Sequence, residues 1–150
     1  GGVLSSKSGQ SELIRFCEQL GLEESAIIEG PVPHEQVEPF YDLIDVFVVS
    51  RPNSRVSRLV TPLKPFEAMR SGRALVMADL PALAEIIKDG ETGVLYPTDD
   101  LENLSEEILE LLNDDQRRES LGRAAKEWIV ANRTWPAVIK PVAEIYRDLR

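Results

Sequence analysis

Short apolar runs alternate with amphipathic segments along this chain, and that alternation predicts an α/β fold. Four runs have the length and composition of strands, at 26–29, 45–50, 75–78 and 94–96. The run at 45–50 is almost continuously apolar, which is typical of a strand buried on both faces of a parallel sheet. Strands that alternate with helices predict a Rossmann-like parallel sheet flanked by helices.

The helices are predicted from apolar residues that recur at helical spacing. We expect loops at 1–10 and 51–60, where polar residues dominate. Three helices follow one another at the C-terminal end, beyond the last predicted strand. The expected helices cover residues 11–20, 34–43, 62–71, 81–87, 101–112, 116–131 and the segment after 135.

One predicted helix begins in a way that suits an anion. Thr61 is a favourable N-cap residue and Pro62 suits the first helical position. The amides of Leu63 and Lys64 would then point out of the helix N-terminus, together with the positive end of its dipole. Such a terminus binds phosphate, and Lys64 adds a full positive charge.

The same region is basic in an acidic chain. Residues 51–73 contain six basic residues and one acidic residue, whereas the rest of the chain contains 11 basic and 25 acidic residues. A basic island of this kind is a candidate anion site. The alternative is an ordinary capped amphipathic helix with a solvated basic flank, and composition does not separate the two.

Composition and length exclude several classes of protein. We expect one domain over residues 1–150, because this length suffices for a sizeable core. A net charge of −9 argues against nucleic-acid binding. The single cysteine, Cys17, excludes an internal disulfide, and no apolar run reaches membrane-spanning length. The chain begins with Gly1 rather than methionine, so we interpret it as a fragment without a visible signal peptide.

A non-catalytic α/β regulatory or interaction domain is the first alternative function. A phospho-receiver domain needs aspartates and a lysine, and Asp45, Asp79 and Lys64 are residues of those types. However, Asp45 begins its predicted strand rather than ending it. Dinucleotide-binding glycine motifs, phosphate-binding Walker loops, paired-cysteine zinc motifs and a Ser/His/Asp triad are missing from the sequence, which leaves many enzyme classes without support.

The order of several short motifs resembles one enzyme family. The motifs are GPVPH at 30–34, YD followed by DVFVVS at 41–50, TPLKPFEAM at 61–69, LAEII with DGETGVL at 83–95, and the segment from Trp135 to Tyr146. Together they resemble the C-terminal half of group 1 retaining glycosyltransferases of GT-B fold. The resemblance implies two Rossmann-like domains that face each other across a cleft, with this chain as the second domain and extra helices at its C-terminal end.

The resemblance also implies roles for individual residues. Glu67 corresponds to the second glutamate of a Glu–seven residues–Glu motif, which binds the ribose hydroxyls of the donor. The position of the first glutamate holds Leu59, so this chain departs from the motif there. The diphosphate would be bound at Leu63, Lys64, Thr61 and Arg58, and the nucleobase would contact Pro31 and Val32.

The implied function is transfer of a sugar from a UDP- or GDP-linked donor to an unidentified acceptor. Fixed amides, a helix dipole and cations can stabilise the departing diphosphate, so we expect neither a metal nor a cofactor. The partner domain would be the protein's own N-terminal domain, and the fragment alone would be inactive. We expect a cytoplasmic protein, with peripheral membrane contact an open option for the full-length chain. A nucleotide-sugar epimerase of GT-B fold is the second alternative.

Overall fold

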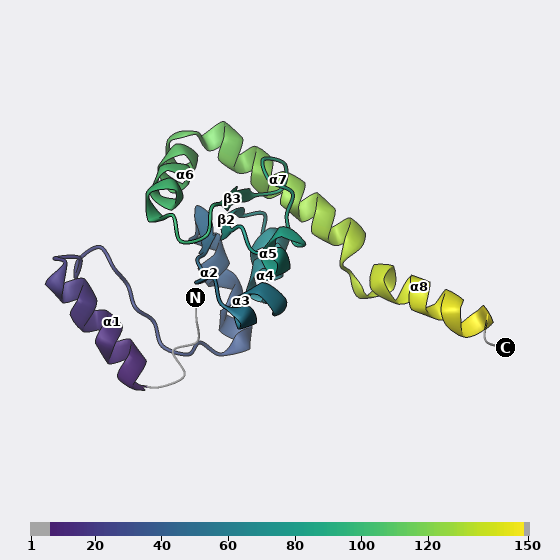
Figure 1. Cartoon of the computed structure of the whole chain (residues 1–150), viewed down its shortest axis with the longest axis horizontal. Helices are drawn as coiled ribbons and strands as arrows, with labels where there is room; N and C mark the ends of the chain where they lie inside the picture. The colour runs from purple at the N-terminus through teal and green to yellow at the C-terminus, as the bar shows by residue number, and fades with distance from the viewer. Residues whose placement is uncertain (1–6, 149–150) are drawn as a thin grey trace. The chain divides into compact units, whose positions relative to one another are not determined.

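The computed structural model describes residues 7–148, which are divided into two compact units, with the boundary in the sequence between Phe40 and Tyr41. The first unit contains α1 (Lys7–Gln19), the 3-10 helix η1 (His34–Gln36) and the start of α2 (Glu38–Asp42). The second unit contains the sheet and the remaining helices (Figure 1). The prediction of a single domain over 1–150 stays a prediction.

Two predictions for the first unit are wrong. Residues 26–29 form no strand, and Ile27 is 88% exposed, because this unit offers no neighbouring strand for backbone pairing among its described residues. The predicted helix at 34–43 is divided into η1 and α2. Pro39 explains the division, since it has no amide hydrogen and its ring blocks a continuous helix from η1.

The helix predicted at 11–20 is present but begins earlier. It starts at Lys7, so the last four positions of the predicted loop at 1–10 are helical. Residues 1–6 of that loop lie outside the described residues. The chain leaves α1 through Gly21, whose φ of 66° is the left-handed conformation that favours glycine after a helix.

The sheet of the second unit has three parallel strands in the order β1-β2-β3. They are β1 (Val46–Val49), β2 (Ala74–Ala78) and β3 (Val94–Tyr96). β2 lies in the middle, with Val76 opposite Val48 on one side and Val94 on the other. The α/β class and the parallel sheet are therefore confirmed.

Burial is centred on β2 rather than on β1. All five residues of β2 are buried, whereas all four residues of β1 are only half-buried. The prediction that 45–50 is buried on both faces is therefore wrong. The physical reason is position: β1 has one neighbouring strand, while β2 has two, and β2 packs against α7 in addition to α4 and α6, which contact both strands.

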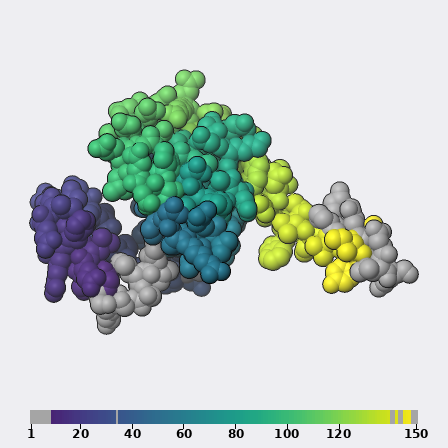
Figure 2. All heavy atoms as spheres, viewed as in Figure 1, coloured from purple at the N-terminus to yellow at the C-terminus, as the bar shows by residue number. Residues whose placement is uncertain are grey.

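The predicted loop at 51–60 contains a short helix. α3 covers Arg55–Leu59, and the Ser54 hydroxyl caps it by accepting from the Ser57 amide at 3.1 Å. Arg51 donates to the Val60 carbonyl at 2.9 Å, so the loop is closed across its two ends. Figure 2 shows the α3 region, in blue, at the surface of the face in view. The next helices are α4 (Lys64–Arg70) and α5 (Pro81–Ala84).

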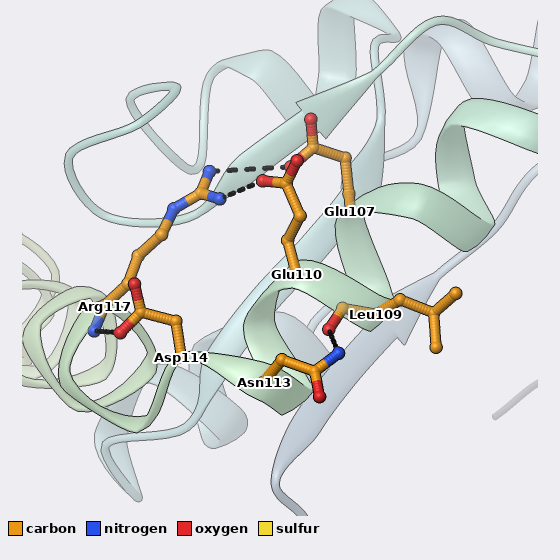
Figure 3. A network of polar contacts seen from close by, with 6 residues as sticks. All are labelled: Glu107, Leu109, Glu110, Asn113, Asp114 and Arg117. Atoms are coloured by element: carbon orange, nitrogen blue, oxygen red, sulfur yellow. Dashed lines mark hydrogen bonds and ion pairs between the residues drawn. The ribbon is translucent and has the colours of Figure 1, made fainter.

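The three predicted C-terminal helices are present, as α6 (Leu101–Asn113), α7 (Asp115–Asn132) and α8 (Trp135–Asp148). The corner between α6 and α7 is held by polar contacts (Figure 3). Asp114 caps α7 by accepting from the Arg117 amide at 2.8 Å. The Arg117 guanidinium contacts Glu110 at 2.6 Å and Glu107 at 3.5 Å. A pocket lies beside this corner, and Arg117, the basic residue in its lining, is paired with these two glutamates.

A close backbone contact joins α7 to the end of α4. Gly72 follows α4 with φ 71°, and its amide donates to the Met69 carbonyl at 2.9 Å while the Arg73 amide donates to the Ala68 carbonyl at 3.0 Å. These two bonds form a Schellman motif. A Cβ at Gly122 in α7 would lie 2.1 Å from the Gly72 carbonyl oxygen. Only glycine fits at that position of α7.

Replacing Gly122 with alanine tests this contact. Alanine normally stabilises a helix interior relative to glycine by about 1 kcal/mol. Here the added methyl group would displace backbone, so Gly122→Ala should instead lower the free energy of unfolding by about 1–3 kcal/mol. Urea unfolding measures the change. Ser120→Ala, at an exposed position of the same helix, is the control and should change stability little. A stabilised Gly122→Ala variant would contradict the observed packing.

Candidate functional site

The helix predicted to carry the site begins two residues later than expected, at Lys64 rather than Pro62. The N-cap of α4 is Leu63, which makes no side-chain cap, so the prediction of Thr61 as N-cap is wrong. Pro65 accounts for the shift. With Thr61 as N-cap, Pro65 would occupy the fourth helical position, which must donate a backbone hydrogen bond. As the second residue of α4 it needs no such bond.

The structure places most of the predicted diphosphate residues along one short stretch. Leu63 and Lys64 stand at the cap and first position of α4, and Thr61 lies two residues before the cap; all three are exposed. Arg58 lies in the last turn of α3 and is exposed. Phosphate binding by these residues stays a prediction. α4 is short, and Pro65, its second residue, has no amide hydrogen to donate to a phosphate.

Glu67 is the predicted residue with the most definite surroundings. It lies in the first turn of α4, is half-buried, and its Oε2 accepts a hydrogen bond from the Tyr41 hydroxyl at 2.6 Å. Tyr41 is buried at 7% exposure and its ring lies 5.9 Å from that of Phe47. Burial, and then the hydrogen bond and charge of Glu67, raise the pKa of Tyr41 above its usual value. Sequence reasoning missed Tyr41, since no local spacing links it to Glu67.

The segment that carries Tyr41 is fastened to the start of β2. Arg73 contacts the Asp42 carboxylate at 3.1 Å and donates to the Ile44 carbonyl at 3.3 Å. The Asp42 side chain is 72% exposed, so this ion pair contributes little to stability. The contacts of Arg73 instead fix the position of residues 42–44 beside the start of β2.

The basic island does not form one anion site. Arg51 is bound to the Val60 carbonyl and Arg73 to Asp42 and Ile44. Both guanidinium groups therefore serve the structure of the loop and of the strand entry. Arg58 and Lys64 are exposed and lie close in sequence to the start of α4.

A cleft of about 660 Å³ lies beside α4. Glu67 lines it, together with Arg70 on the same helix and Arg133 at the junction of α7 and α8. Arg133 also lies over the Trp128 ring, 5.7 Å from its centre. The other lining residues are mostly apolar: Leu63, Phe66, Ile129, Val130, Thr134, Trp135 and Pro136. The cleft thus combines apolar walls with one carboxylate and two cations, a composition that suits a polar organic ligand.

The remaining predicted residues lie elsewhere. Pro31 and Val32 belong to the first unit, where Pro31 is exposed and Val32 is half-buried, and their nucleobase role stays a prediction. Within residues 7–148, no cluster of three or more metal-binding side chains is found. The helices in this part of the chain also lack the length and apolar content needed to cross a membrane.

The acidic pocket of a phospho-receiver is not formed. Asp45 immediately precedes β1, whereas Asp79 immediately follows β2. Because the two strands are parallel and in register, these carboxylates lie at opposite ends of the sheet. The geometry therefore gives the receiver alternative no support.

Comparison with known proteins decides the family. The sequence model described as "Glycosyl transferases group 1" matches residues 1–128, which is most of the chain. The chain belongs to the group 1 glycosyltransferases. This confirms the resemblance noted in its motifs.

Individual relatives agree with the family. The D-inositol 3-phosphate glycosyltransferase of Corynebacterium diphtheriae is 30% identical over 99% of this chain, which covers 33% of that protein. The phosphatidyl-myo-inositol mannosyltransferase of Mycolicibacterium smegmatis is 34% identical over 55% of this chain and 21% of its own length. This glycosyltransferase chain thus spans about a third of the first of these relatives.

Solved structures confirm the fold. A glycosyltransferase from Rickettsia africae matches 99% of this chain and 38% of its own with a TM-score of 0.83 at 14% identity. Anabaena HepE, solved in complex with UDP, matches 97% of this chain and 38% of its own with a TM-score of 0.76 at 19% identity. The GT-B assignment therefore rests on both sequence and structure.

The buried Tyr41 hydroxyl predicts a pH effect on stability. Its pKa is raised in the folded state, so above pH 10.0 the unfolded chain releases this proton while the folded chain keeps it. The free energy of unfolding should therefore fall as pH rises above that value, by about 1.4 kcal/mol per pH unit for each such group. Tyr41→Phe removes one group and should make the decline shallower between about pH 10 and 12. Urea unfolding at each pH measures it, and parallel declines in the two proteins would contradict the assignment.

Proposed function

We propose that the whole protein transfers a sugar from a nucleotide-diphosphate sugar to an acceptor, and that residues 1–150 act together as its donor-binding domain. Membership of the group 1 glycosyltransferases supports the reaction class. The observation that carries the assignment to a site is the Glu67 carboxylate, which is fixed by Tyr41 and lines the cleft beside α4. A carboxylate in that position can accept hydrogen bonds from two ribose hydroxyls.

The donor is proposed to be UDP- or GDP-linked. The complex of Anabaena HepE with UDP supports a uridine diphosphate donor by analogy of fold. Glu67 orders the nucleotide but does not break the glycosidic bond. Lys64, Arg58, Thr61 and the amide at Leu63 would bind the diphosphate. Their charges and dipoles would favour the negative charge that develops on the departing diphosphate, without a metal.

The remaining parts of the proposal concern the rest of the protein. The acceptor would be bound with the help of an N-terminal domain, in keeping with relatives about three times the length of this chain. A cytoplasmic location is proposed because a single cysteine gives no sign of an oxidising compartment.

Glu67→Gln tests the ribose assignment. Glutamine keeps the length of the side chain but removes the charge, and a hydrogen bond to a charged group is worth about 1.5–3 kcal/mol. The affinity of the intact protein for its preferred nucleotide, UDP or GDP, should therefore fall by about 10- to 100-fold, as measured by isothermal titration calorimetry. Glu119→Gln, at an exposed position of α7, is the matched control and should bind as the wild type does. Binding of neither nucleotide by the wild type, or equal affinities for wild type and Glu67→Gln, would refute the proposal.

Lys64→Met tests the diphosphate assignment. Methionine keeps most of the side-chain length and removes the positive charge. The variant should lose about tenfold in affinity for the nucleoside diphosphate and less for the monophosphate, which lacks the second phosphate. Lys126→Met, which removes an exposed lysine of α7, should leave both affinities unchanged. A uniform loss for both nucleotides would contradict a contact between Lys64 and the second phosphate.

A further inference from the structure

The Tyr41–Glu67 pair suggests a second residue of the ribose site. We propose that Tyr41 is the positioning residue of Glu67: its hydroxyl fixes Oε2, so that the carboxylate presents its other oxygen, Oε1, to the ribose hydroxyls. The proposal rests on the ribose-binding role proposed for Glu67. Neither the family match nor the relatives assign a role to Tyr41.

The Glu67 carboxylate can accept hydrogen bonds from the Tyr41 hydroxyl and from a ribose at the same time. An ionised carboxylate offers about four acceptor positions, and the Tyr41 hydroxyl uses one of them, at 2.6 Å. The hydrogen bond that Tyr41 donates is to Oε2, which leaves Oε1 as the oxygen that the proposal assigns to the ribose. Glu67 is only half-buried and lines the cleft, so its carboxylate is accessible to a ligand. The Tyr41–Glu67 pair therefore differs from a buried structural hydrogen bond, because the Glu67 carboxylate can still accept a hydrogen bond from a ligand in the cleft.

Tyr41 is itself held firmly. Its side chain is buried and its ring contacts Phe47, which lies in β1. Its backbone carbonyl accepts from the Ile44 amide at 3.2 Å, and Arg73 fastens the neighbouring Asp42 to the strand entry. The hydroxyl is thus anchored by groups from outside α4, and it can fix a side chain of α4.

The direction of the hydrogen bond is also settled. Burial and the adjacent carboxylate raise the pKa of Tyr41, so its hydroxyl keeps its proton through neutral and mildly alkaline pH. Tyr41 therefore donates and Glu67 accepts.

Fixing Glu67 before the ligand arrives has a measurable consequence. A glutamate side chain has three rotatable torsions, and immobilising such a side chain on binding weakens affinity by about 2- to 13-fold. The hydrogen bond from Tyr41 already immobilises the Glu67 side chain in the free protein, so this loss of conformational freedom does not occur on binding. Its loss should therefore weaken only those ligands that use Glu67, which means ligands with ribose hydroxyls.

The experiment compares UDP (or GDP, if that is preferred) with its 2′,3′-dideoxy analogue, using the intact protein and calorimetry. The wild type should prefer the ribonucleotide by at least about tenfold. Tyr41→Phe should lower that preference by about 3- to 10-fold, through weaker ribonucleotide binding, with the dideoxy affinity nearly unchanged. Tyr96→Phe, which removes the hydroxyl of another buried tyrosine, is the matched control and should keep the full preference.

The outcomes separate this inference from the proposed function. If the wild type binds neither nucleotide, or binds without a ribose preference, the proposed role of Glu67 fails and this inference fails with it. If the wild type shows the preference and folded Tyr41→Phe keeps it, or weakens both ligands equally, only the inference is overturned. Should Tyr41→Phe lack cooperative unfolding, 4-fluorophenylalanine at position 41 fills the hydroxyl volume without a donor and must also lose the preference. 4-Aminophenylalanine at position 41 restores a donor and should restore the preference.

Discussion

The close approach of two backbones, at Gly72 and Gly122, is the constraint on which the second unit depends. It brings α7 against the turn that ends α4 and leads into β2, and any side chain at Gly122 would collide with that turn. β2 is the most buried strand, and it contacts both helices. The same contact places one wall of the cleft, at the C-terminal end of α7, beside the residues of α4 that form the other wall.

A second constraint joins the segment before β1 to α4 and to the start of β2. The stretch from Tyr41 to Arg73 is closed on itself by the ion pair of Asp42 with Arg73 and by the hydrogen bond of Tyr41 with Glu67. These contacts are individually modest, but they connect residues 26 and 31 positions apart in sequence. A carboxylate held in this way loses little conformational freedom when a ligand binds. The fold of residues 41–73 thus orders the Glu67 carboxylate, to which we assign the proposed ribose contact.

The sequence predicted the elements whose signal is local. Helical spacing of apolar residues identified α6, α7 and α8, and turn residues such as Gly72 marked where a helix ends. Features that depend on distant partners were not predicted. The apolar run at 26–29 has strand composition but no strand to pair with in its unit, and β1 has too few neighbours to be fully buried.

The candidate site shows the same division. Glu67 and Lys64 are predicted from sequence because the signals that indicate their proposed roles lie along one helix. The predicted helix start at Thr61 is wrong because Pro65, which has no amide hydrogen, can occupy only the first turn of α4. Tyr41 was missed because its relation to Glu67 exists only in the folded chain, and Arg73 was counted in an anion site although it braces the entry to β2.

The most direct test of the account is a crystal structure of the intact protein with its preferred nucleoside diphosphate bound. The account predicts that the ribose hydroxyl oxygens lie within hydrogen-bond distance of the Glu67 carboxylate while the Tyr41 hydroxyl still donates to that carboxylate. A nucleotide bound with its ribose away from Glu67 would contradict the central claim.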